Sequence, residues 1–137
     1  MLKRKQITAR AIARTILAGL YLVAGGLHLA ASGPFLSIMP PWVPFPGPVV
    51  VFTGLAELAG AFGLMFPRLR RAAGTGLALY AVCVFPANIQ HAMDSLGPAD
   101  ALSGWWYHGP RLLLQPVIVW WALWAGEVVD WPFVRKR

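Results

Sequence analysis

The sequence predicts an all-α fold, a bundle of four transmembrane helices with both ends of the chain in the cytoplasm. Three observations predict it. Hydrophobic residues make up 58% of the 137 residues and charged residues 12%, whereas roughly 25% of a typical soluble domain is charged. The apolar residues form four long runs, and the basic residues cluster outside these runs. A chain of this length is expected to form one domain, here a membrane domain over residues 1–137.

Each apolar run is long enough for one crossing, since a helix needs roughly 20 residues to span a hydrocarbon core about 30 Å thick. The predicted helices cover residues 15–32, 48–66, 72–93 and 111–129. These runs contain Ala, Leu and Gly throughout and do not alternate with a period of two, which argues against strands. The first run also permits a cleaved signal peptide over residues 1–32. We disfavour that alternative, because the run exceeds the roughly 7–15 apolar residues of a signal peptide and contains His28.

Three connections separate the predicted helices. Residues 33–47 contain five prolines, which prevent a continuous helix. We expect a loop at the membrane interface there, with Trp42 and Phe45 as anchors. Residues 67–71 form a short basic turn. Residues 95–110 are predicted to form a longer loop with further interfacial aromatic residues, in which His108 faces solvent.

The basic residues set the predicted orientation. Every Lys and Arg except Arg111 lies before the first run, between the second and third, or after the fourth. With four crossings these groups all fall on one side, which the positive-inside rule assigns to the cytoplasm. The sequence therefore predicts a multi-pass membrane protein with both ends in the cytoplasm and with the lipid bilayer as its partner. A nucleic-acid partner is excluded, because no basic face interleaves with stacking aromatic residues.

Polar residues inside the apolar runs form the candidate site. A charged side chain at mid-membrane costs about 2.5–3.5 kcal/mol on insertion scales, so Glu57 requires a partner, a proton or water. Each of the four runs contributes polar residues to the half of the bundle away from the termini. The candidate binding residues are His28, Thr53, Glu57, Asn88, His91, Arg111 and Gln115.

Two interpretations of this polar cluster compete. In the first, the cluster is structural, with Glu57 paired to Arg111 and the remaining residues satisfying one another. In the second, it forms a small-molecule site in the outer half of the bundle. Nearer the cytoplasmic edge, Glu127 and Asp130 are expected to pair with Arg135 or Lys136.

The sequence indicates no particular catalytic group, and no metal site is predicted. The chain has one cysteine, Cys83, and lacks metal-binding spacings, a glycine-rich phosphate loop and a nucleophile elbow. A quinone is a candidate cofactor. Nothing in the spacing of His28 and His91 requires a haem, which is the less favoured cofactor.

The same polar residues carry a resemblance to the DoxX-like family of small bacterial membrane proteins. It extends from about residue 25 to residue 121. The stretches that carry it are Gly25-Gly26-Leu27-His28, Pro34-Phe35, Ile38-Met39-Pro40-Pro41-Trp42-Val43-Pro44, Thr53-Gly54-x-x-Glu57-x-x-Gly60, Phe85-Pro86-Ala87-Asn88 and Arg111-x-x-x-Gln115. The sequence departs from the family's Pro-x-Trp-Leu-Pro stretch at Val43.

The resemblance implies a four-helix, multi-pass bundle in the bacterial cytoplasmic (inner) membrane and, for some relatives, an association with redox systems. We therefore expect a quinone- or lipid-linked redox accessory subunit rather than a stand-alone enzyme, with a membrane or peripheral redox protein as partner. Histidine and carboxylate can exchange protons, and Arg and Gln can hold carbonyl oxygens. A non-catalytic scaffold or assembly factor is the alternative, and a small transporter is the third reading. A homo-oligomer is an open alternative.

Overall fold

The structure, a computed structural model, describes residues 2–95 and 101–132. Its secondary structure in this part is entirely helical, as predicted. The helices are α1 (Leu2–Ala30), α2 (Ser32–Ser37), α3 (Pro46–Met65), α4 (Arg70–Ser95) and α5 (Ala101–Ala125).

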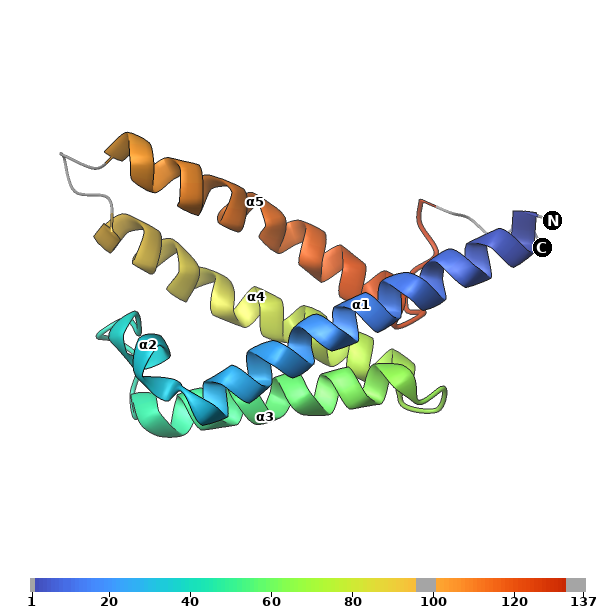
Figure 1. Cartoon of the computed structure of the whole chain (residues 1–137), viewed down its shortest axis with the longest axis horizontal. Helices are drawn as coiled ribbons and strands as arrows, with labels where there is room; N and C mark the ends of the chain where they lie inside the picture. The colour runs from blue at the N-terminus through green and yellow to red at the C-terminus, as the bar shows by residue number, and fades with distance from the viewer. Residues whose placement is uncertain (1, 96–100, 133–137) are drawn as a thin grey trace.

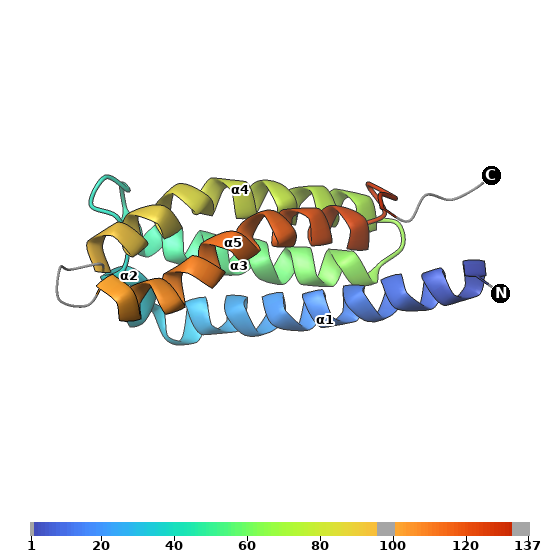
Figure 2. The ribbon, with the colours of Figure 1, turned by 90° about the horizontal axis from the view of Figure 1, so that it is seen from above.

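Four long helices run side by side, and α2 is a short turn between α1 and α3 (Figures 1 and 2). The start of α1, the turn from α3 to α4 and the end of α5 lie at one end of the molecule. We call this the terminal end; it contains Arg14, Arg70 and Glu127. The opposite end contains α2, the end of α4 and the start of α5, and we call it the α2 end. α1 packs mainly on α3, and α5 packs mainly on α4.

Three segments of the described chain are long and apolar enough to cross a membrane: residues 9–30 of α1, all of α3 and all of α4. These three match the first three predicted runs. α5 is also long, but its sequence includes His108, Arg111 and Gln115, which lower its mean hydropathy. The structure thus supports a membrane protein.

Two predicted boundaries were wrong. α1 begins at Leu2 rather than at residue 15, because its basic first turns continue the helix before the apolar run. Residues 101–110 are helical and not part of a loop. Pro110 suggested a helix break because proline cannot donate a backbone hydrogen bond. α5 nevertheless contains both Pro110 and Pro116 in its interior.

The connection between residues 33 and 47 is more ordered than a simple interfacial loop. Pro34 lies in the first turn of α2, and Pro46 is the first residue of α3. Proline is tolerated there, because the backbone N–H groups of a first turn have no hydrogen-bond partner within the helix. The expected anchors are exposed, Trp42 at 58% and Phe45 at 77%. Their exposure agrees with a position at a membrane interface.

Ion pairs join three segments at the terminal end. Glu127 accepts hydrogen bonds from Arg14 (2.7 Å) and Arg70 (2.9 Å), and Asp130 accepts one from Arg10 (2.8 Å). The predicted pairing of these acids with Arg135 or Lys136 falls on residues outside the described part and stays a prediction. Within the described part, the partners of the two acids are arginines of α1 and α4. Sequence proximity suggested Arg135 and Lys136, whereas the fold brings α1 and the start of α4 to the same place.

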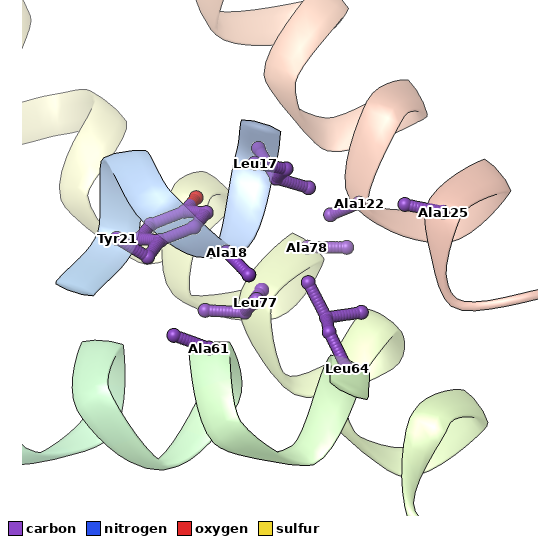
Figure 3. Close-up of a cluster of buried hydrophobic side chains, with 9 residues drawn as sticks. All are labelled: Leu17, Ala18, Tyr21, Ala61, Leu64, Leu77, Ala78, Ala122 and Ala125. Carbon is purple, nitrogen blue, oxygen red and sulfur yellow. The ribbon is translucent and has the colours of Figure 1, made fainter. Parts of the chain in front are cut away.

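The buried apolar core occupies the half of the bundle nearest the terminal end (Figure 3). Leu17 and Tyr21 of α1 meet Leu64 of α3 and Leu77 of α4 there, and alanines of α5 close the cluster. Backbones can approach this closely because small residues lie at the contacts. A Cβ atom on Gly74 of α4 would lie 2.7 Å from the Ala122 carbonyl oxygen of α5.

Candidate functional site

The contact between α1 and α3 positions the first part of the site. Gly25 and Gly54 lie at this contact, and a Cβ atom on Gly25 would lie 2.7 Å from the Gly54 carbonyl oxygen. A Cβ atom on Gly54 would in turn lie 2.8 Å from the Cβ atom of His28. The two glycines therefore bring His28 against α3, within reach of Glu57 one turn further along that helix.

Glu57 lies between three helices with only 4% of its surface exposed. Its Oε1 atom accepts a 2.8 Å hydrogen bond from the hydroxyl of Tyr80 on α4. Its Oε2 atom lies 2.9 Å from Nδ1 of His28. That nitrogen also lies 2.9 Å from the Ala24 carbonyl oxygen, with the better hydrogen-bond geometry. Oε2 consequently receives no well-directed hydrogen bond from the described residues.

The predicted pairing of Glu57 with Arg111 was wrong. Arg111 instead donates a 2.6 Å hydrogen bond from Nη2 to Oδ1 of Asn88. Among the described residues, the salt bridge of Glu57 is with His28. The pairing was inferred from charge and approximate depth, but the packing of α1 on α3 brings His28 to Glu57, and Arg111 bonds to α4 instead.

A directed chain of hydrogen bonds joins α4 to α5. Arg111 donates to Asn88, Asn88 Nδ2 lies 3.4 Å from Oε1 of Gln115, and Gln115 Nε2 donates at 2.6 Å to the Ala81 carbonyl oxygen. Arginine can only donate and a carbonyl oxygen can only accept, so the two ends fix the orientation of both amides. Asn88 thus bonds across to α5 through both atoms of its amide.

Two histidines extend this polar region toward the α2 end. The ring centroids of His91 on α4 and His108 on α5 are 5.1 Å apart, edge to face. His108 is 4% exposed, so the expectation that it faces solvent from a loop was wrong. It is buried because residues 101–110 are helical and pack beside the end of α4.

All seven predicted site residues line one cavity of about 710 Å³ between the α1–α3 and α4–α5 pairs. Ligand pockets in proteins typically measure roughly 300–1,000 Å³ and have mostly apolar walls with a few placed polar groups. This cavity fits that description. Its apolar walls include Phe35, Ile38, Val50, Leu79 and Ile118.

Sequence reasoning missed several residues that shape the cavity. Tyr21 and Tyr80 line its side nearest the core, with ring centroids 6.3 Å apart. Phe35 of α2 stacks on the His28 ring at 3.8 Å. The signal for Tyr80 was present, since a tyrosine in an apolar run requires a hydrogen-bond partner when buried. Thr53 lines the cavity, but its hydroxyl donates to the Val50 carbonyl oxygen in its own helix.

This geometry separates two kinds of polar group along the cavity. Tyr80 and Glu57 lie nearer the core. Together with His28, which stacks on Phe35 of α2, they can exchange protons or hydrogen bonds with a bound molecule. Arg111, which is bonded to Asn88, presents a positive charge at another part of the lining. No group of three or more metal-ligating side chains occurs in residues 2–95 and 101–132.

A family model for a domain of unknown function, DUF8561, matches residues 17–126. The chain belongs to the DUF8561 family. The matched region contains every residue of the candidate site, from His28 to Gln115, so the cavity lies within the DUF8561 domain. Comparisons with curated proteins and with solved structures found no match.

Proposed function

We propose that this DUF8561 protein binds a quinone- or lipid-like amphiphile in the cavity and acts as a redox accessory subunit in the bacterial inner membrane. In this proposal α5 is a fourth crossing, and both termini lie in the cytoplasm. The resemblance to DoxX-like proteins supports the redox association. One observation carries the proposal: a mainly apolar cavity is lined at one place by Tyr80, Glu57 and His28.

The chemistry of a quinone suits this lining. Each carbonyl oxygen takes up one electron and one proton on reduction. Glu57 and His28 are groups that can supply or accept the protons. The described residues hold no electron carrier, so a partner protein supplies the electrons in this proposal. The apolar walls would hold the chain of the molecule.

Binding of decylubiquinone to the purified protein, measured by isothermal titration calorimetry in neutral-lipid nanodiscs, tests the proposal. We expect saturable binding that Glu57→Gln or Tyr80→Phe weakens roughly tenfold, the effect of about 1.4 kcal/mol. Thr75→Val is the matched control, since Thr75 is exposed on α4 and bonds only within its own helix among the described contacts. Native mass spectrometry should show a co-purifying amphiphile.

The same binding experiments also distinguish the redox accessory subunit from the alternative of a non-catalytic scaffold. A protein that binds no quinone and no lipid in the cavity, yet unfolds more easily when Glu57 is replaced, would be a scaffold whose polar residues serve cohesion. The structure of the terminal end favours this second candidate, because Glu127 and Asp130 connect α1, α4 and the segment after α5.

A further inference from the structure

The polar region at the α2 end contains two buried atoms that lack partners. Arg111 Nη1 and His108 Nδ1 are each fully buried and form no hydrogen bond within the described part of the chain. The two residues lie one turn apart on α5, at positions i and i+3, and therefore on the same side of the helix. Arg111 lines the cavity and His108 does not, so the unpaired Nη1 atom of Arg111 is the one that indicates a group supplied by a molecule in the cavity.

The missing group is an acceptor. Arginine has no acceptor atom, so Nη1 can be satisfied only by an oxygen or another acceptor. Asn88 already accepts from Nη2, and its amide nitrogen is directed at Gln115. Both polar atoms of the Asn88 side chain are thus already used.

The missing group is also negatively charged. No carboxylate of residues 2–95 and 101–132 lies within salt-bridge distance of Arg111. Glu57 pairs with His28, and Asp94 accepts from Gln90. Arg111 is only partly buried as a residue, but its Nη1 atom is buried, and a guanidinium desolvated in this way without a counter-charge is disfavoured. Carboxylate and phosphate oxygens are the acceptors that match its parallel donors best.

The rest of the cavity indicates what carries this acidic group. Arg111 and His91 line one part of the cavity, and most of the remaining wall is apolar. Arg111 supplies the positive charge of this lining, so an anionic head would lie at Arg111 and the apolar part would extend toward Tyr80. We infer that the ligand is an acidic amphiphile, with its carboxylate or phosphate bound by Arg111 and its chain in the cavity.

This inference rests on the proposed function, because it assumes that an amphiphile occupies the cavity. The test compares probes in neutral-lipid nanodiscs by isothermal titration calorimetry. Dodecanoate and dodecyl phosphate carry the acidic head and the chain, dodecanol carries the chain alone, and acetate and inorganic phosphate carry the head alone. We expect the acidic amphiphiles to bind roughly 10- to 100-fold more tightly than dodecanol, as a charge-assisted hydrogen bond predicts.

Variants locate the site. Arg111→Gln should remove the preference for dodecanoate over dodecanol, and Arg111→Lys should retain part of it. Arg68→Gln is the matched control, since it removes the same charge from an exposed position at the terminal end. If Arg111→Gln does not fold, the comparison of dodecanoate with dodecanol on the unaltered protein still decides the question.

The outcomes separate this inference from the function on which it rests. Equal binding of dodecanol and dodecanoate would overturn the acidic head and leave an amphiphile site. Binding of decylubiquinone without dodecanoate would also overturn it and leave the quinone proposal intact. Equally tight binding of inorganic phosphate and dodecyl phosphate would overturn the role of the chain. No binding by any amphiphile would overturn both proposals.

Discussion

Gly25 of α1 and Gly54 of α3 lie so close together that a Cβ atom on Gly25 would lie 2.7 Å from the Gly54 carbonyl oxygen. Backbone oxygen cannot move aside as a side chain can. This contact sets the distance between α1 and α3, and hence the distance between His28 and Glu57. The helix contact and the candidate site therefore depend on the same pair of glycines.

Replacing Gly25 with alanine should destabilise the bundle. The added methyl group forces α1 away from α3, and overpacking of this kind costs about 1–3 kcal/mol. Gly26→Ala is the matched control, because a Cβ atom there has no neighbour within 4 Å. Thermal unfolding in detergent should show a lower Tm for Gly25→Ala only. Equal Tm values for the two variants would mean that the helices are not in contact at Gly25.

Glu57 and Tyr80 should be energetically coupled, whereas Glu57 and Arg111 should not. In a double-mutant cycle, the losses of stability from Glu57→Gln and Tyr80→Phe should differ from additivity by about 0.5–3 kcal/mol, as expected for residues in contact. The losses from Glu57→Gln and Arg111→Gln should add within about 0.5 kcal/mol. Thermal unfolding of the unaltered protein, the three single variants and the two double variants measures both coupling energies. Strong coupling of Glu57 to Arg111 would restore the pairing expected from the sequence.

Glu127 should make stability depend on pH in the acid range. Partial burial opposes its ionisation, but the hydrogen bonds and charges of Arg70 and Arg14 outweigh burial and lower the pKa of Glu127 below its usual 4.5. Its contribution to stability is therefore complete above the unfolded pKa of 4.5 and is lost as the pH falls through the lower folded value.

The difference in Tm between the unaltered protein and Glu127→Gln measures this contribution. We expect a constant difference above about pH 5.5 that shrinks progressively below pH 4.5. Asp94→Asn is the control, because Asp94 lies at the α2 end and bonds to Gln90. A difference that grows toward acid pH would contradict the ion-pair network.

Cys83 should react slowly with charged, water-soluble maleimides in intact membranes. It lies midway along α4, with its side chain on the exposed surface of the helix and beside the cavity. In a membrane that surface faces lipid, where the reactive thiolate is disfavoured. A Ser95→Cys, Cys83→Ala double variant should react quickly, since Ser95 ends α4 and is exposed. Fast labelling of Cys83 would reveal an aqueous pathway and favour the transporter reading.

Both termini should face the cytoplasm. The start of α1, the α3–α4 turn and the end of α5 lie at one end of the molecule (Figure 1), and this end contains Arg10, Arg14, Arg68, Arg70 and Arg71. C-terminal fusions to green fluorescent protein should fluoresce, and fusions to alkaline phosphatase should be inactive. Active phosphatase would mean an odd number of crossings, in which α5 does not span the membrane.

The sequence alone determined the membrane character, the three apolar helices and the set of polar residues around the cavity. These properties depend on hydropathy and charge along the chain, which local patterns record directly. A helix of apolar residues must bury its few polar groups inward, so His28, Glu57, Asn88 and Arg111 could be predicted to converge. The helical state of residues 101–110 was not predicted, because Gly109 and Pro110 are residues that usually end a helix.

Only the tertiary structure decided which polar groups meet. The partner of Glu57 depends on how far α1 and α3 approach and on how each helix is rotated, and the contact of Gly25 with Gly54 sets both. For the same reason Glu127 meets Arg14 of α1 and Arg70 of α4, which are far from it in the sequence. Partner choice among buried charges follows from backbone distances of a few ångströms, and those distances arise from packing between helices remote in the chain.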